Sequence, residues 1–161
     1  MIFDVDGVLT DGRIYYTDSG EEMKAFSTLD GHGIRMLMAS GVKVAIITGR
    51  HSGVVSHRAR NLGISAVLQG VEDKRAAFLQ LAASVGLIAA DCGYMGDDVI
   101  DLPVMTRCSF AASTREAPEY VRQRAHFVAT QPAGAGAARE VCETIMRAQG
   151  TFDAALARYL A

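Results

Sequence analysis

The sequence predicts an α/β domain of three layers, in which helices cover both faces of a mostly parallel sheet. Short apolar runs alternate along the chain with segments of helical periodicity, which is the order of strands and helices in this class. The run VKVAII at 42–47 is almost continuously apolar, as expected of a strand covered on both faces. Residues alternate around the turn DSG near 18–20, which indicates a small hairpin. We therefore predict a Rossmann-like domain with a β-hairpin inserted after the first strand.

The composition is that of one globular domain covering 1–161. Half of the 161 residues are hydrophobic and 21% are charged, which suits a single packed core. The 16 basic and 18 acidic side chains nearly balance, so charge gives no reason to expect nucleic acid or a membrane surface as a partner. No apolar run approaches the roughly 18 residues of a spanning helix, and no signal peptide is evident, so we expect a cytoplasmic protein. The three cysteines are expected to be buried free thiols.

The first elements follow from apolar spacing and turn residues. We predict a buried strand at 1–5 and hairpin strands at 13–17 and 21–26. The next segment has helical spacing, with Asp30 as its expected N-cap and Gly41 as its terminator. The inner face of this helix is expected to carry Ile34, Leu37 and Met38.

Strands and helices then alternate to the end of the chain. After the strand at 42–50, further strands are predicted at 66–70, 92–98 and 109–113. The helices between and after them are predicted at 53–63, 73–85, 100–105 and 136–149. The tail at 150–161 is weakly amphipathic, and helix, disorder and docking on a neighbour all stay open for it.

Polar side chains suited to a metal site follow three of the predicted strands. Asp4 and Asp6 lie at the end of the first predicted strand, and Thr48 lies at the end of the strand at 42–50. Asp97 lies at the end of the strand at 92–98, and Lys74 lies near the start of the helix at 73–85. Because ligands of parallel sheets bind beyond the carboxyl ends of the strands, we expect these groups to lie together. An incomplete set of oxygen ligands leaves room for water and phosphate, which is typical of Mg²⁺.

These residue types indicate phosphoryl transfer through a covalent intermediate. Asp4 is the candidate nucleophile, and Asp6 is the candidate acid and base for the leaving group and the attacking water. Thr48 and Lys74 are expected to hold the phosphoryl oxygens, and Asp97 to complete the metal site. Both carboxylates at 4 and 6 leave the strand end on one side because they are two residues apart.

Structural interpretations stay open for several of these groups. Asp4 and Asp6 also suit a simple polar strand exit, Thr48 could cap the next helix, and Lys74 could lie at a solvated helix start. Asp98 suits a supporting position beside the metal as well as direct catalysis. The four histidines show no shared metal spacing, so none is placed in the catalytic set.

The stretches DVDGVLTD and ITGR, then Lys74, then GDD resemble in order and spacing the four motifs of the haloacid dehalogenase-like phosphohydrolases. The hairpin DSGEEMKAF with TLDGHGIRML and IITGRHSGVVSHRARNLGI is similar to enzymes of the capless subclass that hydrolyse 3-deoxy-D-manno-octulosonate 8-phosphate. The resemblance therefore implies a Mg²⁺-dependent phosphatase that acts on a small phosphorylated sugar acid in lipopolysaccharide precursor biosynthesis. A nine-carbon acylneuraminate 9-phosphate is the alternative substrate. A phospho-accepting signalling module is the alternative of another class.

The resemblance also implies a set of site residues and an assembly. Mg²⁺ would bind the side chains of Asp4 and Asp97 and the backbone carbonyl of Asp6. Contacts with the sugar phosphate would come from Asp6, Ser27, Thr28, Leu29, Asp30, Gly31, Arg35, Arg50, Arg58 and Lys74. Relatives form homotetramers through the hairpin at about 13–26, so that a neighbour closes the site.

One segment departs from the family pattern. Family members typically carry an Arg between the glycines before the last long helix, where this chain has Ala135 within PAGAGAARE. That departure leaves open whether the C-terminal tail reaches a neighbour's site, although Arg139 is nearby. The chain also begins directly at the first strand, so the sequence leaves open whether a segment precedes it.

Overall fold

Six short strands form one parallel sheet in the computed structural model, which describes residues 1–160. Their order across the sheet is β5-β4-β1-β6-β7-β8. The strands are β1 (Ile2–Phe3), β4 (Ala45–Ile47), β5 (Ala66–Leu68), β6 (Gly93–Met95), β7 (Phe110–Ser113) and β8 (Phe127–Val128). All five pairings in this sheet are parallel, so the predicted α/β fold with a mostly parallel sheet is confirmed.

β1 lies at the centre of the sheet, where the direction of strand order changes. It pairs with β4 on one side and with β6 on the other. The chain extends the sheet outward through β4 and β5, then returns and extends it through β6, β7 and β8. Such a switch point opens a crevice beyond the carboxyl end of the central strand. The acidic segment that follows β1 therefore lies at the place where α/β sheets bind ligands.

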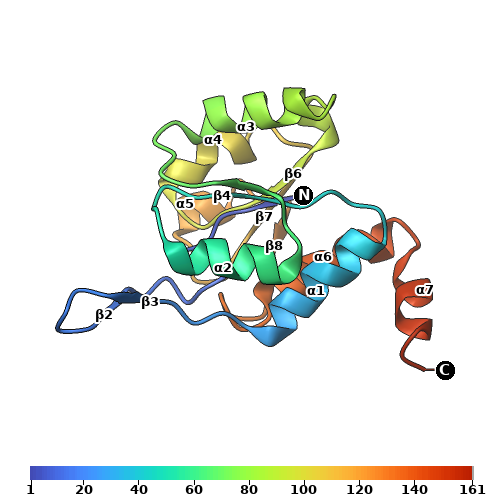
Figure 1. Ribbon diagram of the computed structural model, residues 1–161. Helices are drawn as coiled ribbons and strands as arrows, with labels where there is room; N and C mark the ends of the chain where they lie inside the picture. Colours follow the sequence, from blue (N-terminus) through green and yellow to red (C-terminus); the bar gives the residue numbers. More distant parts are fainter. Residues whose placement is uncertain (161) are drawn as a thin grey trace.

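Helices cover both faces of the sheet and make three layers (Figure 1). One face is covered by α1 (Thr28–Ala39), α2 (Gly53–Leu62) and α6 (Ala137–Ala148), and the other by α3 (Lys74–Ser84), α4 (Leu102–Met105) and α5 (Glu119–Arg122). Short 3-10 turns precede β6 and α4, at η1 (Ala89–Asp91) and η2 (Val99–Asp101). Successive strand residues point to opposite faces, so Phe3 joins the core under α1 and Ile2 joins the core under α3.

The start of α1 differs from the prediction. Ser27, three residues before Asp30, is the N-cap, and its hydroxyl accepts hydrogen bonds from the backbone N–H groups of Leu29 and Asp30. The Asp30 carboxylate instead accepts from Gly136 N at 3.2 Å and Arg139 N at 2.8 Å. Asp30 is buried, and it caps the distant helix α6 in place of its own. The N-cap prediction for Asp30 was therefore wrong.

The predicted hairpin is present, and it projects from the body of the molecule. Its strands β2 (Tyr15–Tyr16) and β3 (Glu22–Met23) pair antiparallel, and both extend away from the sheet (Figure 1). Ile14, Tyr16 and Met23 are exposed on it. Phe26, at its base, instead packs against the core under α1.

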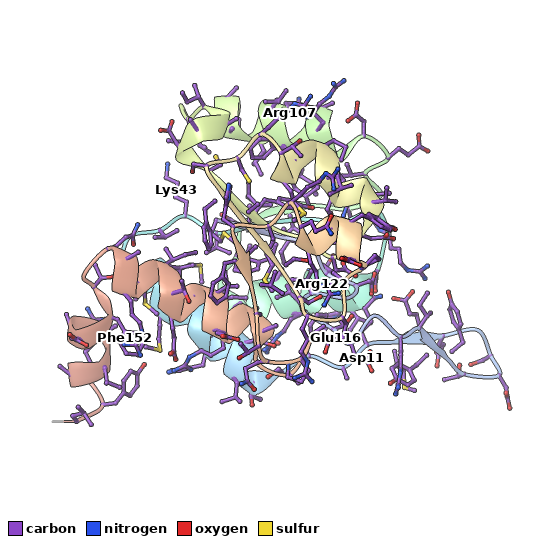
Figure 2. The ribbon with its side chains drawn as sticks, turned by 180° about the vertical axis from the view of Figure 1, so that it is seen from behind. Asp11, Lys43, Arg107, Glu116, Arg122 and Phe152 are labelled. Carbon is purple, nitrogen blue, oxygen red and sulfur yellow. The ribbon has the colours of Figure 1, made fainter. Side chains whose placement is uncertain are left out.

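The C-terminal tail forms α7 (Phe152–Ala157), at the opposite end of the molecule from the hairpin. The view from behind labels Phe152 on this helix and Asp11 at the root of the hairpin, and it shows the same separation (Figure 2). Phe152 is buried in the core under α1, and the ring of Tyr159 lies against His32. The tail therefore packs on its own chain from 152 to 159, while Ala161 lies outside the described residues.

One α-helix and one β-strand were missing from the prediction. α5 is a four-residue helix and β8 a two-residue strand, and neither is long enough to show a period in the sequence. None of the helices within residues 1–160 is long and apolar enough to cross a membrane. Cys92, Cys108 and Cys142 are buried and free, as predicted.

Candidate active site

Three carboxylates converge beyond the carboxyl ends of β1 and β6. Asp4 follows β1, and its backbone N–H donates to Met95 O at 3.0 Å, which extends the pairing of the two strands. Asp97 follows β6, and Asp101 lies one helical turn further along the chain. One oxygen from each of the three lies within 4.8 Å of the others, close enough to share one cation.

Lys74 reaches this cluster from the first turn of α3. Its Nζ lies 3.0 Å from Asp4 Oδ1 and 2.7 Å from Asp101 Oδ1. The lysine is only 2% exposed, which excludes the solvated helix start as an interpretation. The ammonium therefore links the two carboxylates and compensates part of their charge.

Asp101 is buried and was absent from the predicted site. Its Oδ1 accepts from Lys74 and from the Tyr94 hydroxyl, each at 2.7 Å. Its Oδ2 accepts from the backbone N–H groups of Asp97 at 3.0 Å and Asp98 at 3.1 Å. All four partners are donors, so Asp101 fixes both the lysine and the turn that presents Asp97. The spacing of four residues between Asp97 and Asp101 in GDDVID was the signal that could have found it.

The proximity of these acids changes their affinity for protons. Burial, together with the charge of Asp101, raises the pKa of Asp4 to about 7. Burial, reinforced by the neighbouring carboxylates, raises the pKa of Asp97 to about 8. Burial works to lower the pKa of Lys74, but the charges of Asp4 and Asp101 outweigh it and raise that pKa above its usual value. The pocket therefore carries more negative charge than Lys74 balances.

The donor set fits a divalent cation with oxygen ligands. Asp97 Oδ1 is buried and receives no hydrogen bond from residues 1–160, and Asp4 Oδ1 has the Lys74 ammonium at 3.0 Å as its neighbour. Both acids favour protonation when no cation is present. A cation at this point would satisfy the free oxygens and remove the repulsion that raises the two pKa values. The residues present therefore fit Mg²⁺.

Gly7 forms one wall of the site at a point where no side chain fits. Its backbone has a φ of +84°, and a Cβ at this position would overlap the Asp97 carboxylate. Glycine adopts this left-handed conformation at no steric cost. The turn after Asp6 can therefore pass directly against Asp97.

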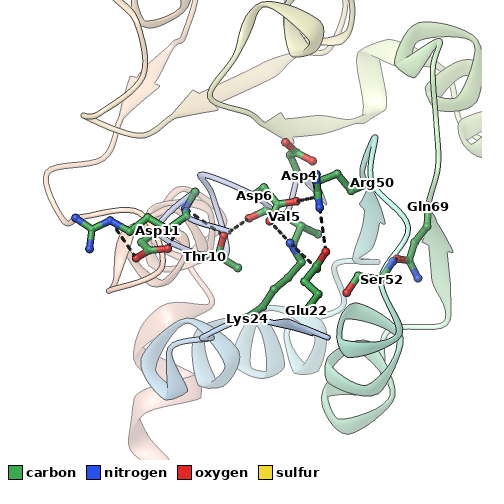
Figure 3. A network of polar contacts seen from close by, with 12 residues as sticks. Asp4, Val5, Asp6, Thr10, Asp11, Glu22, Lys24, Arg50, Ser52 and Gln69 are labelled. Atoms are coloured by element: carbon green, nitrogen blue, oxygen red, sulfur yellow. Dashed lines mark hydrogen bonds and ion pairs between the residues drawn. The ribbon is translucent and has the colours of Figure 1, made fainter. Parts of the chain in front are cut away.

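Asp6 lies outside the buried triad, in a ring of charged groups that involves the hairpin (Figure 3). Its Oδ1 contacts Lys24 Nζ, and its Oδ2 lies 3.8 Å from Arg50 Nε. Glu22 completes the ring, because its two oxygens lie 3.1 Å from Lys24 Nζ and 3.0 Å from Arg50 Nη2. Lys24 and Glu22 are charged residues of an exposed hairpin, and the sequence carries no signal that places them at the site.

Thr48 and Asp98 follow β4 and β6, the two strands that pair with β1. Thr48 is buried after β4, with its backbone N–H on Leu68 O at 2.9 Å. The residue before α2 is Ser52, so Thr48 does not cap that helix. Asp98 is exposed, and its carboxylate accepts from Val99 N at 2.7 Å at the start of η2, which is the structural interpretation left open for it.

The remaining residues predicted to contact the sugar phosphate lie at the start of α1 or are arginines that hydrogen-bond to backbone carbonyls. Thr28 and Leu29 are exposed at the start of α1, whereas Gly31 lies directly against the Arg58 guanidinium. Arg58 Nη2 donates to Ser27 O at 2.8 Å, so it holds the segment 27–31 in place. Arg35 lies apart from the acidic cluster and donates to Asn61 O at the end of α2.

The glycine-rich segment before α6 packs on its own chain. Gly134 N donates to Val8 O at 3.0 Å, in the loop that follows the acidic segment. Arg139 Nε pairs with Glu143 one turn along α6 at 2.5 Å, and its backbone N–H is held by Asp30. Ala135 therefore lies in a loop that supports the loop after β1.

Comparisons with known proteins identify the family. No family model matches the chain. The sequence is 43% identical over 155 residues to 3-deoxy-D-manno-octulosonate 8-phosphate phosphatase KdsC of Yersinia pestis, covering 96% of this chain and 83% of that protein. The chain belongs to the 3-deoxy-D-manno-octulosonate 8-phosphate phosphatase family. The predicted membership of the haloacid dehalogenase-like phosphohydrolases is thereby confirmed, and the signalling module is not favoured.

Solved structures agree with this assignment. The phosphatase of this family from Moraxella catarrhalis, in a crystal with a magnesium ion, a phosphate ion and a KDO molecule, superposes with a TM-score of 0.96 at 43% identity and covers 98% of this chain and 91% of that one. A probable YrbI family phosphatase from Pseudomonas syringae superposes with a TM-score of 0.98 at 48% identity, covering 99% and 91%. The fold of the 3-deoxy-D-manno-octulosonate 8-phosphate phosphatase family thus extends over nearly the whole chain.

Proposed function

We propose that this chain is a single-domain, Mg²⁺-dependent phosphatase that hydrolyses 3-deoxy-D-manno-octulosonate 8-phosphate to the free sugar acid and phosphate, in lipopolysaccharide precursor biosynthesis. The observation that carries this proposal is the buried cluster of Asp4, Asp97 and Asp101 around Lys74, at the switch point of the sheet. The Moraxella relative, which holds magnesium, phosphate and the sugar acid, supports it.

The proposed reaction has two steps, and Asp4 is covalently modified between them. In the first, an Asp4 oxygen attacks phosphorus, the bond from phosphorus to the sugar oxygen breaks, and that oxygen takes a proton from the Asp6 carboxyl group. In the second, a water oxygen attacks phosphorus, its proton passes to Asp6, and the bond from phosphorus to Asp4 breaks. Both acids then return to their starting states, so the cycle is balanced.

Other groups of the site would manage charge during these steps. Asp4 and Asp97 would hold Mg²⁺ through side chains, and Asp6 would add its backbone carbonyl. When bound, the cation supplies positive charge that lets an anionic nucleophile approach an anionic phosphoryl group. Lys74 and Thr48 would bind the phosphoryl oxygens, and Asp101 would keep Lys74 in place.

Phosphate release from a panel of sugar phosphates tests the proposal. With Mg²⁺ present, we expect turnover of 3-deoxy-D-manno-octulosonate 8-phosphate by the wild-type protein and by Asp18→Asn, which changes an exposed hairpin acid. We expect none by Asp4→Asn, which removes the nucleophile. Wild-type turnover no higher than that of Asp4→Asn on every substrate would overturn the enzymatic assignment. Faster turnover of acylneuraminate 9-phosphate would overturn the assignment of the eight-carbon substrate.

We further infer a homotetramer that assembles through the hairpin in the cytoplasm. The hairpin exposes three apolar side chains: Ile14 at 44%, Tyr16 at 60% and Met23 at 55%. Its two strands form a separate sheet, which is too small to be stable by itself and needs another surface to pack against. Burial of these side chains against other copies would remove that exposed apolar surface. Sedimentation of Tyr16→Ser with Met23→Ser, expected to give smaller species than the wild type, tests the assembly. Tetramers that persist in this variant would contradict it.

A further inference from the structure

The hairpin brings two charged side chains to Asp6, and the reaction proposed above uses neither. Lys24 directly follows β3, and its side chain is 0% exposed although β2 and Met23 beside it are exposed. Its ammonium contacts Asp6 Oδ1 and lies 3.1 Å from Glu22 Oε1. A fully covered ammonium has lost its hydration, so these two carboxylates determine its position.

The ring that contains Lys24 is electrically neutral when Asp6 is ionised, which is its state after it has given its proton to the leaving group. Around it, Asp6, Lys24, Glu22 and Arg50 alternate in sign, and each charge has a partner of opposite sign on both sides. Arg50 is 40% exposed and lies at 3.8 Å from Asp6, so it is the member that solvent and an anionic ligand reach most easily. The contact between Lys24 and Asp6 lies on the covered side of the ring.

The two oxygens of Asp6 have different surroundings. Oδ1 is held by Lys24, whereas Oδ2 is buried and receives no hydrogen bond from residues 1–160. Asp6 lies three residues beyond the end of β1, so the hydrogen bonds between β1 and its two neighbouring strands do not hold its backbone. An acid that exchanges protons with a leaving group needs one oxygen free and a carboxyl plane held in a fixed direction. Lys24 holds the carboxyl plane of Asp6 through Oδ1, and it leaves Oδ2 free for proton exchange.

We propose that Lys24 is a positioning residue for Asp6, and that Glu22 keeps the Lys24 ammonium in place. This inference rests on the proposed function, in which Asp6 gives its proton to the departing sugar oxygen. The hairpin is then a working part of the active site of its own chain, in addition to its surface for assembly.

Two phosphate esters separate positioning of Asp6 from a general loss of structure. A sugar alkoxide is a poor leaving group that needs a proton, whereas p-nitrophenolate leaves without one. For Lys24→Met, which removes the ammonium and keeps an unbranched side chain one atom shorter, we expect kcat/KM on the sugar phosphate to fall about 100-fold. We expect kcat/KM on p-nitrophenyl phosphate to change little. Glu22→Gln should shift the ratio of the two values in the same direction, and Glu21→Gln, an exposed neighbour, should leave it unchanged.

The ratio of the two kcat/KM values does not depend on how much of the protein is folded. Equal losses on both esters would show that Lys24 only supports the hairpin, and would overturn the inference. A Lys24→Met variant with wild-type values on both esters would overturn it as well. Wild-type protein that releases no phosphate from the sugar ester above the level of Asp4→Asn would instead overturn the proposed function, since that comparison does not involve Lys24.

Discussion

Lys74 Nζ donates a 2.7 Å hydrogen bond to Asp101 Oδ1 at a point where both side chains are almost completely buried. Every group that contacts Asp101 is a donor, so an amide at this position would turn an N–H toward another N–H whichever way it faced. Lys74 would also lose one of its two charged partners.

We therefore expect Asp101→Asn to lower the free energy of unfolding by about 3 kcal/mol, because it breaks a buried ion pair. It should also lower the affinity for Mg²⁺ about 10- to 100-fold, since Asp101 supports the turn at Asp97. Urea denaturation and Mg²⁺ titration measure the two effects. Asp153→Asn, on the exposed side of α7, is the control and should match the wild type. An Asp101→Asn variant with unchanged values would contradict the role assigned to this carboxylate.

Without divalent metal, stability should fall as the pH rises from about 4 to 8. The pKa values of Asp4 and Asp97 are about 7 and about 8 in the folded protein, above their ordinary values. Over this range these two carboxyl groups bind more protons in the folded state than in the unfolded state, so they contribute a negative slope of stability against pH. Saturating Mg²⁺ should reduce this slope, because the bound cation replaces the protons.

Asp97→Asn tests the origin of that pH dependence. In EDTA at pH 8 we expect this variant to be more stable than the wild type by on the order of 2 kcal/mol, since it removes a half-buried charge that forms no ion pair with residues 1–160. At pH 4 the two proteins should be nearly equal. Chemical denaturation at both pH values measures the difference. A variant that is less stable than the wild type at pH 8 would show that Asp97 does not carry the repulsion.

Gly7→Ala should abolish most activity through displacement of Asp97. The added Cβ would overlap that carboxylate, and a shift of about 1 Å in a catalytic site costs roughly 100-fold in rate. Gly20→Ala is a matched control, because Gly20 has a φ of +82° against +84° for Gly7 but open space around its Cβ position. Both variants carry the same backbone strain, so only Gly7→Ala should lose phosphatase activity. Equal activities of the two variants would show that the close approach of Gly7 to Asp97 is not needed for phosphatase activity.

Asp30→Ala should destabilise the protein more than Ser27→Ala. Removal of the Ser27 cap costs about 1 kcal/mol at the start of α1. Removal of the Asp30 carboxylate leaves the N–H groups of Gly136 and Arg139 without an acceptor inside the protein, which costs about 2 to 3 kcal/mol. Urea denaturation of both variants gives the comparison. A larger effect at Ser27 would mean that Asp30 is dispensable for the attachment of α6.

Local patterns were sufficient to predict most of the fold and the candidate groups at the strand ends. Asp4, Thr48 and Asp97 each follow an apolar run, and the parallel order of the strands brings such positions together. Asp101, Lys24 and Asp30 were missed or assigned differently because their partners are remote in sequence or on another element. Asp30 shows the reason most clearly, since it is 106 residues from Gly136 and a local rule made it an N-cap.

The central position of β1 has a consequence for synthesis of the protein on the ribosome. Its two partners, β4 and β6, begin at residues 45 and 93, so β1 is flanked on both sides only after residue 93 has been made. At about 5 to 20 residues per second, that interval is roughly 5 to 20 seconds. Throughout this time the acidic segment lacks Asp97 and Asp101, so the site is incomplete even after Lys74 has been made. Catalytic competence therefore begins only after residue 101 has been made.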